Sequence, residues 1–168
     1  NPLKSKKGMA PLPARLASAR HAARRTRIRP TAIEAELGTR YTIDTLRALQ
    51  RRHPKRRFIW IMGADNLALF HQWKDWRAIA RLMPIAVIAR PGYDSRAVAA
   101  PAMAWFRRFV RRRGQKKQWT HGTAPALLQL RFRPDKRSAT AIRAADPMWF
   151  MRYDGRPVRD AVTHKTYA

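Results

Sequence analysis

Two short, uninterrupted apolar runs are the clearest pattern along the chain. Phe58–Met62 lies between basic residues and a glycine, and Pro84–Ala89 ends at a Pro-Gly turn. Such a run without polar alternation is typical of a strand buried on both faces in a parallel sheet. A third strand is expected at Leu127–Phe132, and a weaker alternation over Ile28–Leu37 predicts one more short strand.

Helices are predicted where apolar residues recur at helical spacing between these runs. Their expected ranges are Leu12–Arg25, Thr42–Arg52, Leu67–Phe70, Trp73–Leu82, Ala97–Arg113 with a break near Pro101, and a last short helix from Ser138 or Thr140. Short strands that alternate with helices predict parallel βαβ units, and hence an α/β fold class. The polar stretch 146–168 shows no such pattern, so we expect an irregular, loosely attached tail.

The composition favours a folded protein with a strongly basic surface. Hydrophobic residues make up 45% of the 168 residues, and 37 Lys and Arg against 10 Asp and Glu give a net charge of +27. This surface attracts phosphates, whether they belong to nucleic acids, anionic membranes or nucleotides. Charge alone does not choose among them.

Several classes of protein are disfavoured by what the sequence lacks. It contains no cysteine, so it has neither disulfides nor thiolate chemistry, which fits a cytoplasmic location. No apolar run approaches the roughly 20 residues of a membrane-spanning helix, so no membrane partner is expected. The five histidines are scattered without ligand spacing, and no metal site is predicted.

Two clusters follow the apolar runs, at the strand ends where open α/β sheets bind ligands. In Gly63-Ala64-Asp65-Asn66, the glycine lets the backbone approach a ligand and Asp65 can accept ribose hydroxyls. An ordinary strand-to-helix turn capped by Asp65 explains the same residues about equally well. Arg90 can hold a phosphate through two parallel hydrogen bonds, although a chain this basic also carries many solvated arginines.

Two further features have both a functional and a structural interpretation. Ser138, Thr140 and Arg143 place hydroxyls, backbone N–H groups and a guanidinium at a helix start. They form either an anion site or a simple cap beside a solvated arginine. Trp73 either stacks on a heterocycle at a pocket rim or, as is more usual, packs in the core.

A basic run near Arg107 to Lys117 is interleaved with the aromatic residues Trp105, Phe106, Phe109 and Trp119. This arrangement suits a nucleic-acid groove, but more often it is the exposed face of a helix whose aromatic side chains pack inward. Non-specific nucleic-acid binding without catalysis is therefore an alternative function.

Taken in order along the chain, these clusters resemble the bacterial nicotinate-nucleotide adenylyltransferases. The matching pieces are Asn1-Pro2-Leu3-Lys4, the segment from Glu36 to Leu46, Gly63-Ala64-Asp65-Asn66-Leu67 leading to Phe70 and Trp73, Arg90-Pro91-Gly92-Tyr93, and Ser138-Ala139-Thr140-Ala141-Ile142-Arg143. Each piece is weak alone, but their common order is not expected by chance. The resemblance implies a Rossmann-like nucleotidyltransferase fold, a parallel sheet with helices on both faces.

The resemblance also implies an activity and its partners. The family joins ATP to nicotinate mononucleotide with Mg²⁺ and makes deamido-NAD and pyrophosphate in NAD biosynthesis. The mechanism is in-line attack of the mononucleotide phosphate on the α-phosphorus of ATP. Such a reaction depends mainly on positioning and charge stabilisation.

Site residues follow by position within the matching pieces. Tyr41 and Thr42 are expected to line the nicotinate end and Trp73 to stack on its ring, while Asp65 holds a ribose. The phosphate of the mononucleotide would be neutralised by Lys4 and Arg90. ATP is expected to contact Gly63, Ser138, Thr140 and Arg143.

The sequence departs from the family at its start. The family opens with a first strand and a Gly-rich turn that ends in a catalytic His-x-Gly-His pair, and no such pair occurs in this chain. We therefore expect that an upstream βα segment is missing, and no catalytic residue is assigned. The predicted nucleotidyltransferase domain covers residues 1–145, the tail covers 146–168, and a catalytically dead remnant of the enzyme is a further alternative.

Overall fold

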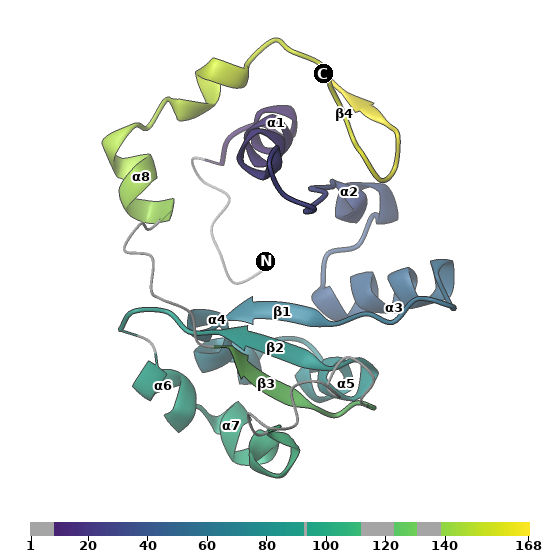
Figure 1. Cartoon of the computed structure of the whole chain (residues 1–168), viewed down its shortest axis with the longest axis vertical. Helices are drawn as coiled ribbons and strands as arrows, with labels where there is room; N and C mark the ends of the chain where they lie inside the picture. Colours follow the sequence, from purple (N-terminus) through teal and green to yellow (C-terminus); the bar gives the residue numbers. More distant parts are fainter. Residues whose placement is uncertain (1–8, 93, 112–122, 131–138) are drawn as a thin grey trace. The chain divides into compact units, whose positions relative to one another are not determined.

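The described residues of a computed structural model, 9–92, 94–111, 123–130 and 139–168, form two compact units. Unit 1 combines the two ends of the chain, Asn1–Arg40 and Arg137–Ala168, and unit 2 is the continuous segment Tyr41–Lys136. None of the helices in the described part of the chain has the length and apolar character needed to cross a bilayer. Figure 1 identifies the elements of both units.

Unit 2 is built on a parallel sheet. Its strands among the described residues are β1 (Trp60–Gly63), β2 (Ile85–Ile88) and β3 (Leu127–Leu130). They lie side by side in that order (Figure 1). Ile85 is paired with Trp60 on one side and with Leu127 on the other. The predicted α/β class and parallel sheet are thus confirmed, although β1 begins two residues after the start of its apolar run and β2 lies inside its run.

The helices of unit 2 largely follow the predicted ranges. They are α3 (Thr42–Arg52), α4 (Ala64–Leu69), η1 (Phe70–Gln72), α5 (Trp76–Leu82), α6 (Asp94–Ala99), α7 (Pro101–Phe106) and η2 (Arg107–Phe109). The break near Pro101 is confirmed, because proline opens α7, a position for which its fixed φ is suited. The predicted start at Trp73 is wrong. Asp75 has a left-handed φ of 50°, so α5 begins only at Trp76.

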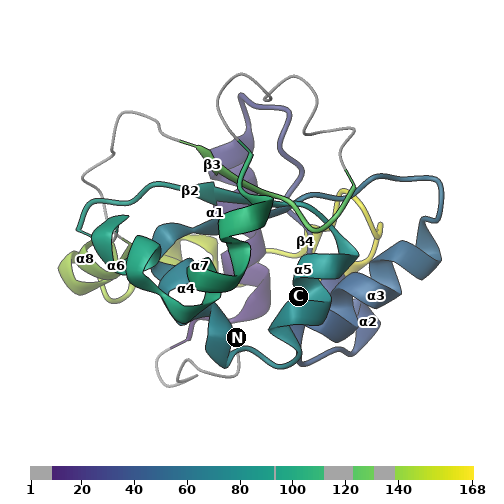
Figure 2. The same cartoon turned by 90° about the horizontal axis from the view of Figure 1, so that it is seen from below.

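The core of unit 2 lies between one face of the sheet and these helices. Met62, Val87 and Leu127 point to this face, where Phe70 and Phe106 stack with ring centroids 6.2 Å apart. Figure 2 shows α4, α5, α6 and α7 along one side of the strands. Burying one such phenylalanine stabilises the fold by roughly 1.5–3 kcal/mol.

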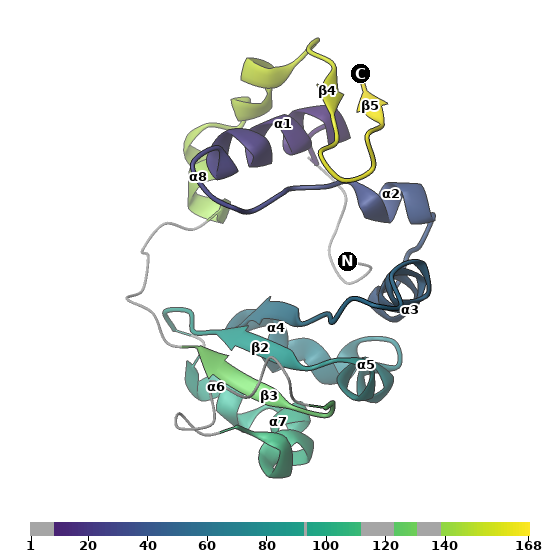
Figure 3. The same ribbon diagram turned by 45° about the vertical axis from the view of Figure 1, so that its right-hand side comes forward.

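Unit 1 has mainly helical elements and a short hairpin. They are α1 (Leu12–Ala23), α2 (Ile33–Leu37), α8 (Ala139–Ala145), η4 (Trp149–Tyr153), β4 (Val158–Arg159) and β5 (Thr166–Tyr167). Figure 3 shows the antiparallel β4–β5 hairpin next to α1. The α1 and α8 predictions are confirmed.

The short strand predicted in Ile28–Leu37 is wrong, because its second half is helix α2. Glu34 and Glu36 lie in the first turn, where negative charge favours the helix dipole. Gly38 then ends the helix in a left-handed conformation with φ 61°, which glycine adopts without steric cost. These local signals outweigh the weak alternation.

The stretch 146–168 is not the irregular, loosely attached tail that its polar sequence predicts. It contains η4 and the hairpin, and Asp160 within it is fully buried. The assignment of the nucleotidyltransferase domain to residues 1–145 stays a prediction.

Asp160 joins the two ends of the chain within unit 1. Its Oδ2 accepts hydrogen bonds from the Thr31 hydroxyl at 2.9 Å and the Ala32 N–H at 2.6 Å. Its Oδ1 accepts from the N–H groups of Val162 at 2.7 Å and Thr163 at 2.9 Å. Burial alone raises the pKa of this carboxyl, but the four hydrogen bonds outweigh burial and lower the pKa to about 2.

Candidate functional site

Three of the predicted site residues meet where β1 and β2 end. Gly63 closes β1, Asp65 lies in the first turn of α4, and Arg90 follows β2 by two residues. Because parallel strands end at the same edge of the sheet, Asp65 and Arg90 approach each other. The distance from Arg90 Nε to Asp65 Oδ1 is 3.3 Å. The two clusters predicted separately from the sequence thus form one site.

Gly63 is required by space and not by backbone conformation. Its φ of −78° suits any residue. A Cβ at this position, however, would lie 2.3 Å from Asp65 Oδ1 and 2.8 Å from Arg90 Nε. The two side chains therefore meet directly over the glycine, and any side chain at 63 would displace the pair.

The pair is asymmetric in exposure. The Arg90 side chain is 57% exposed, whereas that of Asp65 is 22% exposed. The Oδ1 atom of Asp65 is buried and accepts no hydrogen bond from the described residues. The site therefore presents a reachable guanidinium beside a carboxylate oxygen that still has acceptor capacity.

Tyr41 and Thr42 lie at the start of α3. Tyr41 is the N-cap residue, and its ring packs against the core of unit 2. The Lys74 ammonium lies 4.5 Å from the centre of that ring and 3.7 Å from Asp44 Oδ2. Lys74 is a neighbour of the predicted site that its position in a polar stretch did not reveal.

Trp73 lies in an aromatic cluster. Its ring centroid is 5.4 Å from that of Phe70 and 6.5 Å from that of Trp60, in both cases edge to face. The ring is half-buried, so it both packs against the core and reaches the surface. Packing against the core is therefore confirmed for Trp73, and its stacking on a heterocycle stays a prediction.

The structure does not bring Trp73 together with the Asp65–Arg90 pair. Trp73 contacts Trp60 at the start of β1, whereas the pair lies beyond Gly63 at its end. Three residues of strand span about 10 Å. A ligand that reached both places would need to be about as long as a nucleotide.

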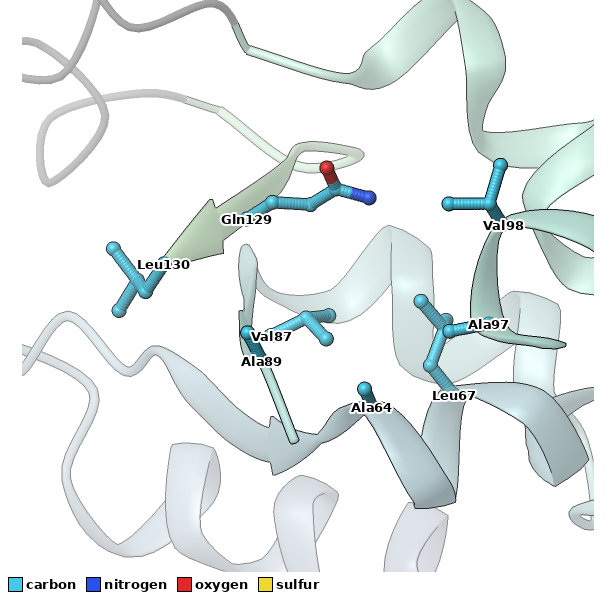
Figure 4. Close-up of a pocket in the computed structure, with 8 residues that line it drawn as sticks. All are labelled: Ala64, Leu67, Val87, Ala89, Ala97, Val98, Gln129 and Leu130. Atoms are coloured by element: carbon cyan, nitrogen blue, oxygen red, sulfur yellow. The ribbon is translucent and has the colours of Figure 1, made fainter. Parts of the chain in front are cut away.

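A small cavity opens beside this strand edge, on the side of α6. Its volume is about 40 Å³, room for a few water molecules but far below the several hundred Å³ of a nucleotide pocket. Figure 4 shows the Gln129 amide reaching across it toward Val98. The lining residues are Ala64, Leu67, Val87, Ala89, Ala97, Val98, Gln129 and Leu130. This cavity does not hold the substrates.

The predicted ATP-binding residues belong to unit 1, apart from Gly63. Thr140 and Arg143 lie on α8, and the Arg143 side chain is exposed. Arg143 lines a larger groove of about 510 Å³ with Trp149 and Tyr153, two residues that sequence reasoning left in the tail without a role. Their four-residue spacing was the available signal. Lys4 and Ser138 lie outside the described residues.

The aromatic residues of the basic run pack inward where the structure describes them. Phe106 is fully buried, and Trp105 and Phe109 pack against the same core. Arg107 and Arg108 are exposed. The structural interpretation of this run is therefore confirmed for these residues. Their aromatic rings pack against the core and do not line a nucleic-acid groove. Trp119 lies outside the described residues.

Metal-binding groups are also sparse. The described part of the chain contains no cluster of three or more His, Cys, Asp or Glu side chains that could hold a metal ion.

Comparisons with known proteins show the family to which the chain belongs. A family model described as Cytidylyltransferase-like matches residues 1–145. A "Probable nicotinate-nucleotide adenylyltransferase" of Erythrobacter litoralis is 59% identical over 166 residues, which are 99% of this chain and 76% of the relative. A protein of the same name from Parvibaculum lavamentivorans is 48% identical over 85% of this chain and 71% of its own length.

A solved structure is also similar, at a lower level. It is described as Plasmodium falciparum nicotinic acid mononucleotide adenylyltransferase complexed with APC, with 14% identity and a TM-score of 0.41 over 63% of this chain and 44% of that chain. Residue roles are not transferred at this distance.

Proposed function

Because the chain belongs to the nicotinate-nucleotide adenylyltransferases within the cytidylyltransferase-like family, we propose that it transfers the adenylyl group of ATP to nicotinate mononucleotide. The products are deamido-NAD and pyrophosphate. One observation carries the proposal, the identity of 59% that extends over 99% of the chain to a relative of that name. The cytoplasmic location predicted from the sequence stays part of the proposal.

Arg90 is the residue that we assign to the phosphate of the mononucleotide. Its guanidinium is exposed and already held near one position by Asp65. A partly exposed ion pair of this kind is worth about 0–1 kcal/mol, so an incoming phosphate with more negative charge can take over the guanidinium at little cost. Two parallel N–H···O bonds then fix the phosphate.

Asp65 serves the ribose in this proposal. Its buried Oδ1 accepts no hydrogen bond from the described residues, and a ribose hydroxyl is a donor of the right size. When the phosphate takes over Arg90, this oxygen would lose its ion-pair partner, and a buried acceptor left unsatisfied costs about 1–3 kcal/mol, which a bound sugar hydroxyl would recover. Tyr41, Thr42 and Trp73 are assigned to the nicotinate ring, about one nucleotide length from the pair.

The reaction itself is an in-line displacement at the α-phosphorus of ATP. The residues of this chain bind and orient the two substrates and neutralise charge, with Lys4, Ser138, Thr140 and Arg143 as proposed phosphate contacts. Mg²⁺ is proposed as the metal. The described residues do not fit a protein-held metal centre, whereas Mg²⁺ commonly arrives on nucleotide phosphates, and no step is assigned to it.

The proposal is tested by titrating the 168-residue chain with nicotinate mononucleotide and by measuring pyrophosphate release when ATP is added. We expect saturable binding and release that depends on the mononucleotide. Arg90→Ala should weaken mononucleotide binding about 10-fold or more, because a charge-assisted pair is lost. Trp73→Ala should weaken it about 5-fold or more through lost stacking.

Arg51→Ala is the matched control, since Arg51 is an exposed arginine near the end of α3. It should leave the affinity unchanged. Equal losses in Arg51→Ala and Arg90→Ala would show that only general positive charge is at work, and absence of mononucleotide binding would reject the proposal. Binding without any pyrophosphate release would identify a catalytically dead relative of the enzyme.

A further inference from the structure

A dense group of basic residues lies at the end of α3 and in the turn that follows it. Six of the 11 residues from 47 to 57 are Lys or Arg, against 37 of 168 in the whole chain, and all six are exposed. Figure 1 shows the connection from α3 to β1 in which they lie. We refer to this surface as the α3 patch, and its residues are Arg47, Arg51, Arg52, Lys55, Arg56 and Arg57.

The first half of the α3 patch lies on the helix itself. Arg47 and Arg51 are four residues apart, so they lie on the same face of α3, about 6 Å apart along its axis. Neither is paired with a carboxylate of the described residues. Positive charge in the last turn of a helix favours its dipole, which accounts for Arg51 and Arg52. It does not account for the three cations that follow the helix.

The second half of the α3 patch lies on a fixed turn. The Arg56 N–H donates to the His53 carbonyl at 3.0 Å and closes a turn with Pro54 in its second position, where the fixed φ of proline is favourable. The His53 ring then contacts the Phe58 ring, with centroids 6.4 Å apart. Folding has thus already ordered the backbone that presents Lys55 and its neighbours, which lowers the entropy cost of binding a partner.

The chemistry of the α3 patch suits a chain of phosphates. Five of its six cations are arginines, whose guanidinium groups form two parallel hydrogen bonds with phosphate oxygens. Charges spread over a helix and a turn can engage several phosphates at once. None of the exposed large apolar side chains of the described chain falls within 47–57, whereas binding to a membrane surface also uses apolar area. A nucleic-acid backbone therefore fits this surface better than a membrane does.

We infer that the α3 patch docks the sugar-phosphate backbone of a nucleic-acid duplex without reading its sequence. Contacts to phosphates fix position but carry no sequence information. A duplex is favoured over a single strand, because the α3 patch contains no aromatic residue on which unpaired bases could stack. The patch precedes β1, whereas the Asp65–Arg90 pair follows it. Docking therefore leaves the proposed substrate site free and adds a second binding activity to the proposed function.

The test is fluorescence anisotropy of a labelled duplex of about 20 base pairs with the full chain, at salt concentrations between about 50 and 200 mM. Log affinity should fall linearly with log salt, and duplexes of unrelated sequence should bind equally. The triple variant Arg47→Gln, Arg51→Gln, Arg56→Gln should lower this slope by about 2–3, because each phosphate contact contributes about 0.9. Its affinity at about 0.1 M salt should be about 10-fold weaker or more.

A matched control removes the same charge elsewhere in unit 2. Arg77, Arg81 and Arg108 are exposed, and their guanidinium carbons lie over aromatic rings at 4.7, 5.8 and 5.1 Å from the ring centres. Changing these three to Gln should alter the slope by less than about 1. Replacing the three patch arginines by Lys keeps the charge and should retain the slope. Unchanged affinity for nicotinate mononucleotide shows that each variant is folded.

The inference is overturned if the patch variant binds the duplex as the unaltered chain does, or if the control loses as much slope as the patch variant. Vesicles with about 30% phosphatidylserine test the membrane as partner. They should bind the unaltered chain and the patch variant to the same extent. Patch-dependent vesicle binding with patch-independent duplex binding would assign the surface to a membrane instead. Pyrophosphate release is measured separately, so failure of the α3 patch leaves the proposed function standing.

Discussion

The two units of the chain are stabilised in different ways. Unit 2 has a continuous apolar core in which aromatic rings from η1, α5 and α7 pack against strand residues. Among the described residues of unit 1, the buried apolar cluster consists of Leu16, Ala32 and Val158, with the partly buried Leu12, Ala17 and Tyr167 packed against it. In unit 1 the buried carboxylate of Asp160 binds residues near both ends of the chain.

The comparison shows how a small, very basic unit can be held together. Apolar burial scales with area and tolerates some change in shape. A buried carboxylate depends instead on having all of its donors present together. Each hydrogen bond to a charged group is worth about 1.5–3 kcal/mol, and removing one donor leaves a buried charged oxygen unsatisfied, which destabilises the fold. Unit 2 should therefore be sensitive to side-chain volume, and unit 1 to charge and pH.

The largest effect is expected from Phe106→Ala in unit 2. The ring is fully buried between Phe70 and Trp105, so truncation leaves a cavity and should cost about 3–5 kcal/mol. The measurement is amide hydrogen exchange of β2 residues. Leu69→Ala is the control, since Leu69 is 48% exposed, and an equal loss of protection in both variants would contradict a volume-sensitive core.

A smaller effect is expected from Asp160→Asn in unit 1. The amide keeps the volume but turns an NH₂ toward backbone N–H donors, which should cost about 2–3 kcal/mol. The loss of unfolding free energy would be measured by urea unfolding, monitored through hydrogen exchange of the Ala32 amide. Thr31→Val removes a single hydrogen bond and should cost about 1 kcal/mol. No difference between Asp160→Asn and exposed Asp154→Asn would show that the network is not a major support.

A third effect concerns the pH dependence of stability. The pKa of Asp160 is lowered from 3.8 to about 2 in the folded state, so ionised Asp160 contributes about 2 kcal/mol that is fully present above roughly pH 4. This stability is lost as the pH falls through the folded pKa. Protection factors in unit 1, which correct the exchange rates for the intrinsic effect of pH, should fall between pH 4 and about 2, and this fall should be absent in Asp160→Asn. A pH dependence that persists in the variant would assign it to other carboxyls.

Elements with strong local signals could be predicted from the sequence. The apolar runs before Gly63 and Arg90 became β1 and β2, and Pro101 marked the start of α7. The errors occur where a backbone detail decides the boundary. The left-handed Asp75 delays α5 to Trp76, and nothing in the hydrophobic pattern reports that conformation.

Part of the site could be predicted for a topological reason. Because ligands bind where parallel strands end, Asp65 and Arg90 could each be predicted at a strand end, whereas their direct ion pair is a finding of the structure. The groove lined by Arg143, Trp149 and Tyr153 could not be predicted in this way. Its walls join Ser18 to Trp149, and no local pattern relates residues so far apart. Asp160 was missed for the same reason, because Thr31 is 129 residues away.

This separation has a consequence for how the protein is made. All the residues of unit 2 have been synthesised before the second half of unit 1 is translated. At a synthesis rate of about 5–20 residues per second, the 129 residues between Thr31 and Asp160 correspond to roughly 6–26 s. During that interval the carboxylate that will hold the Thr31–Ala32 turn does not yet exist. Unit 1 can therefore acquire its hairpin and its Asp160 hydrogen bonds only after the whole of unit 2 has been translated.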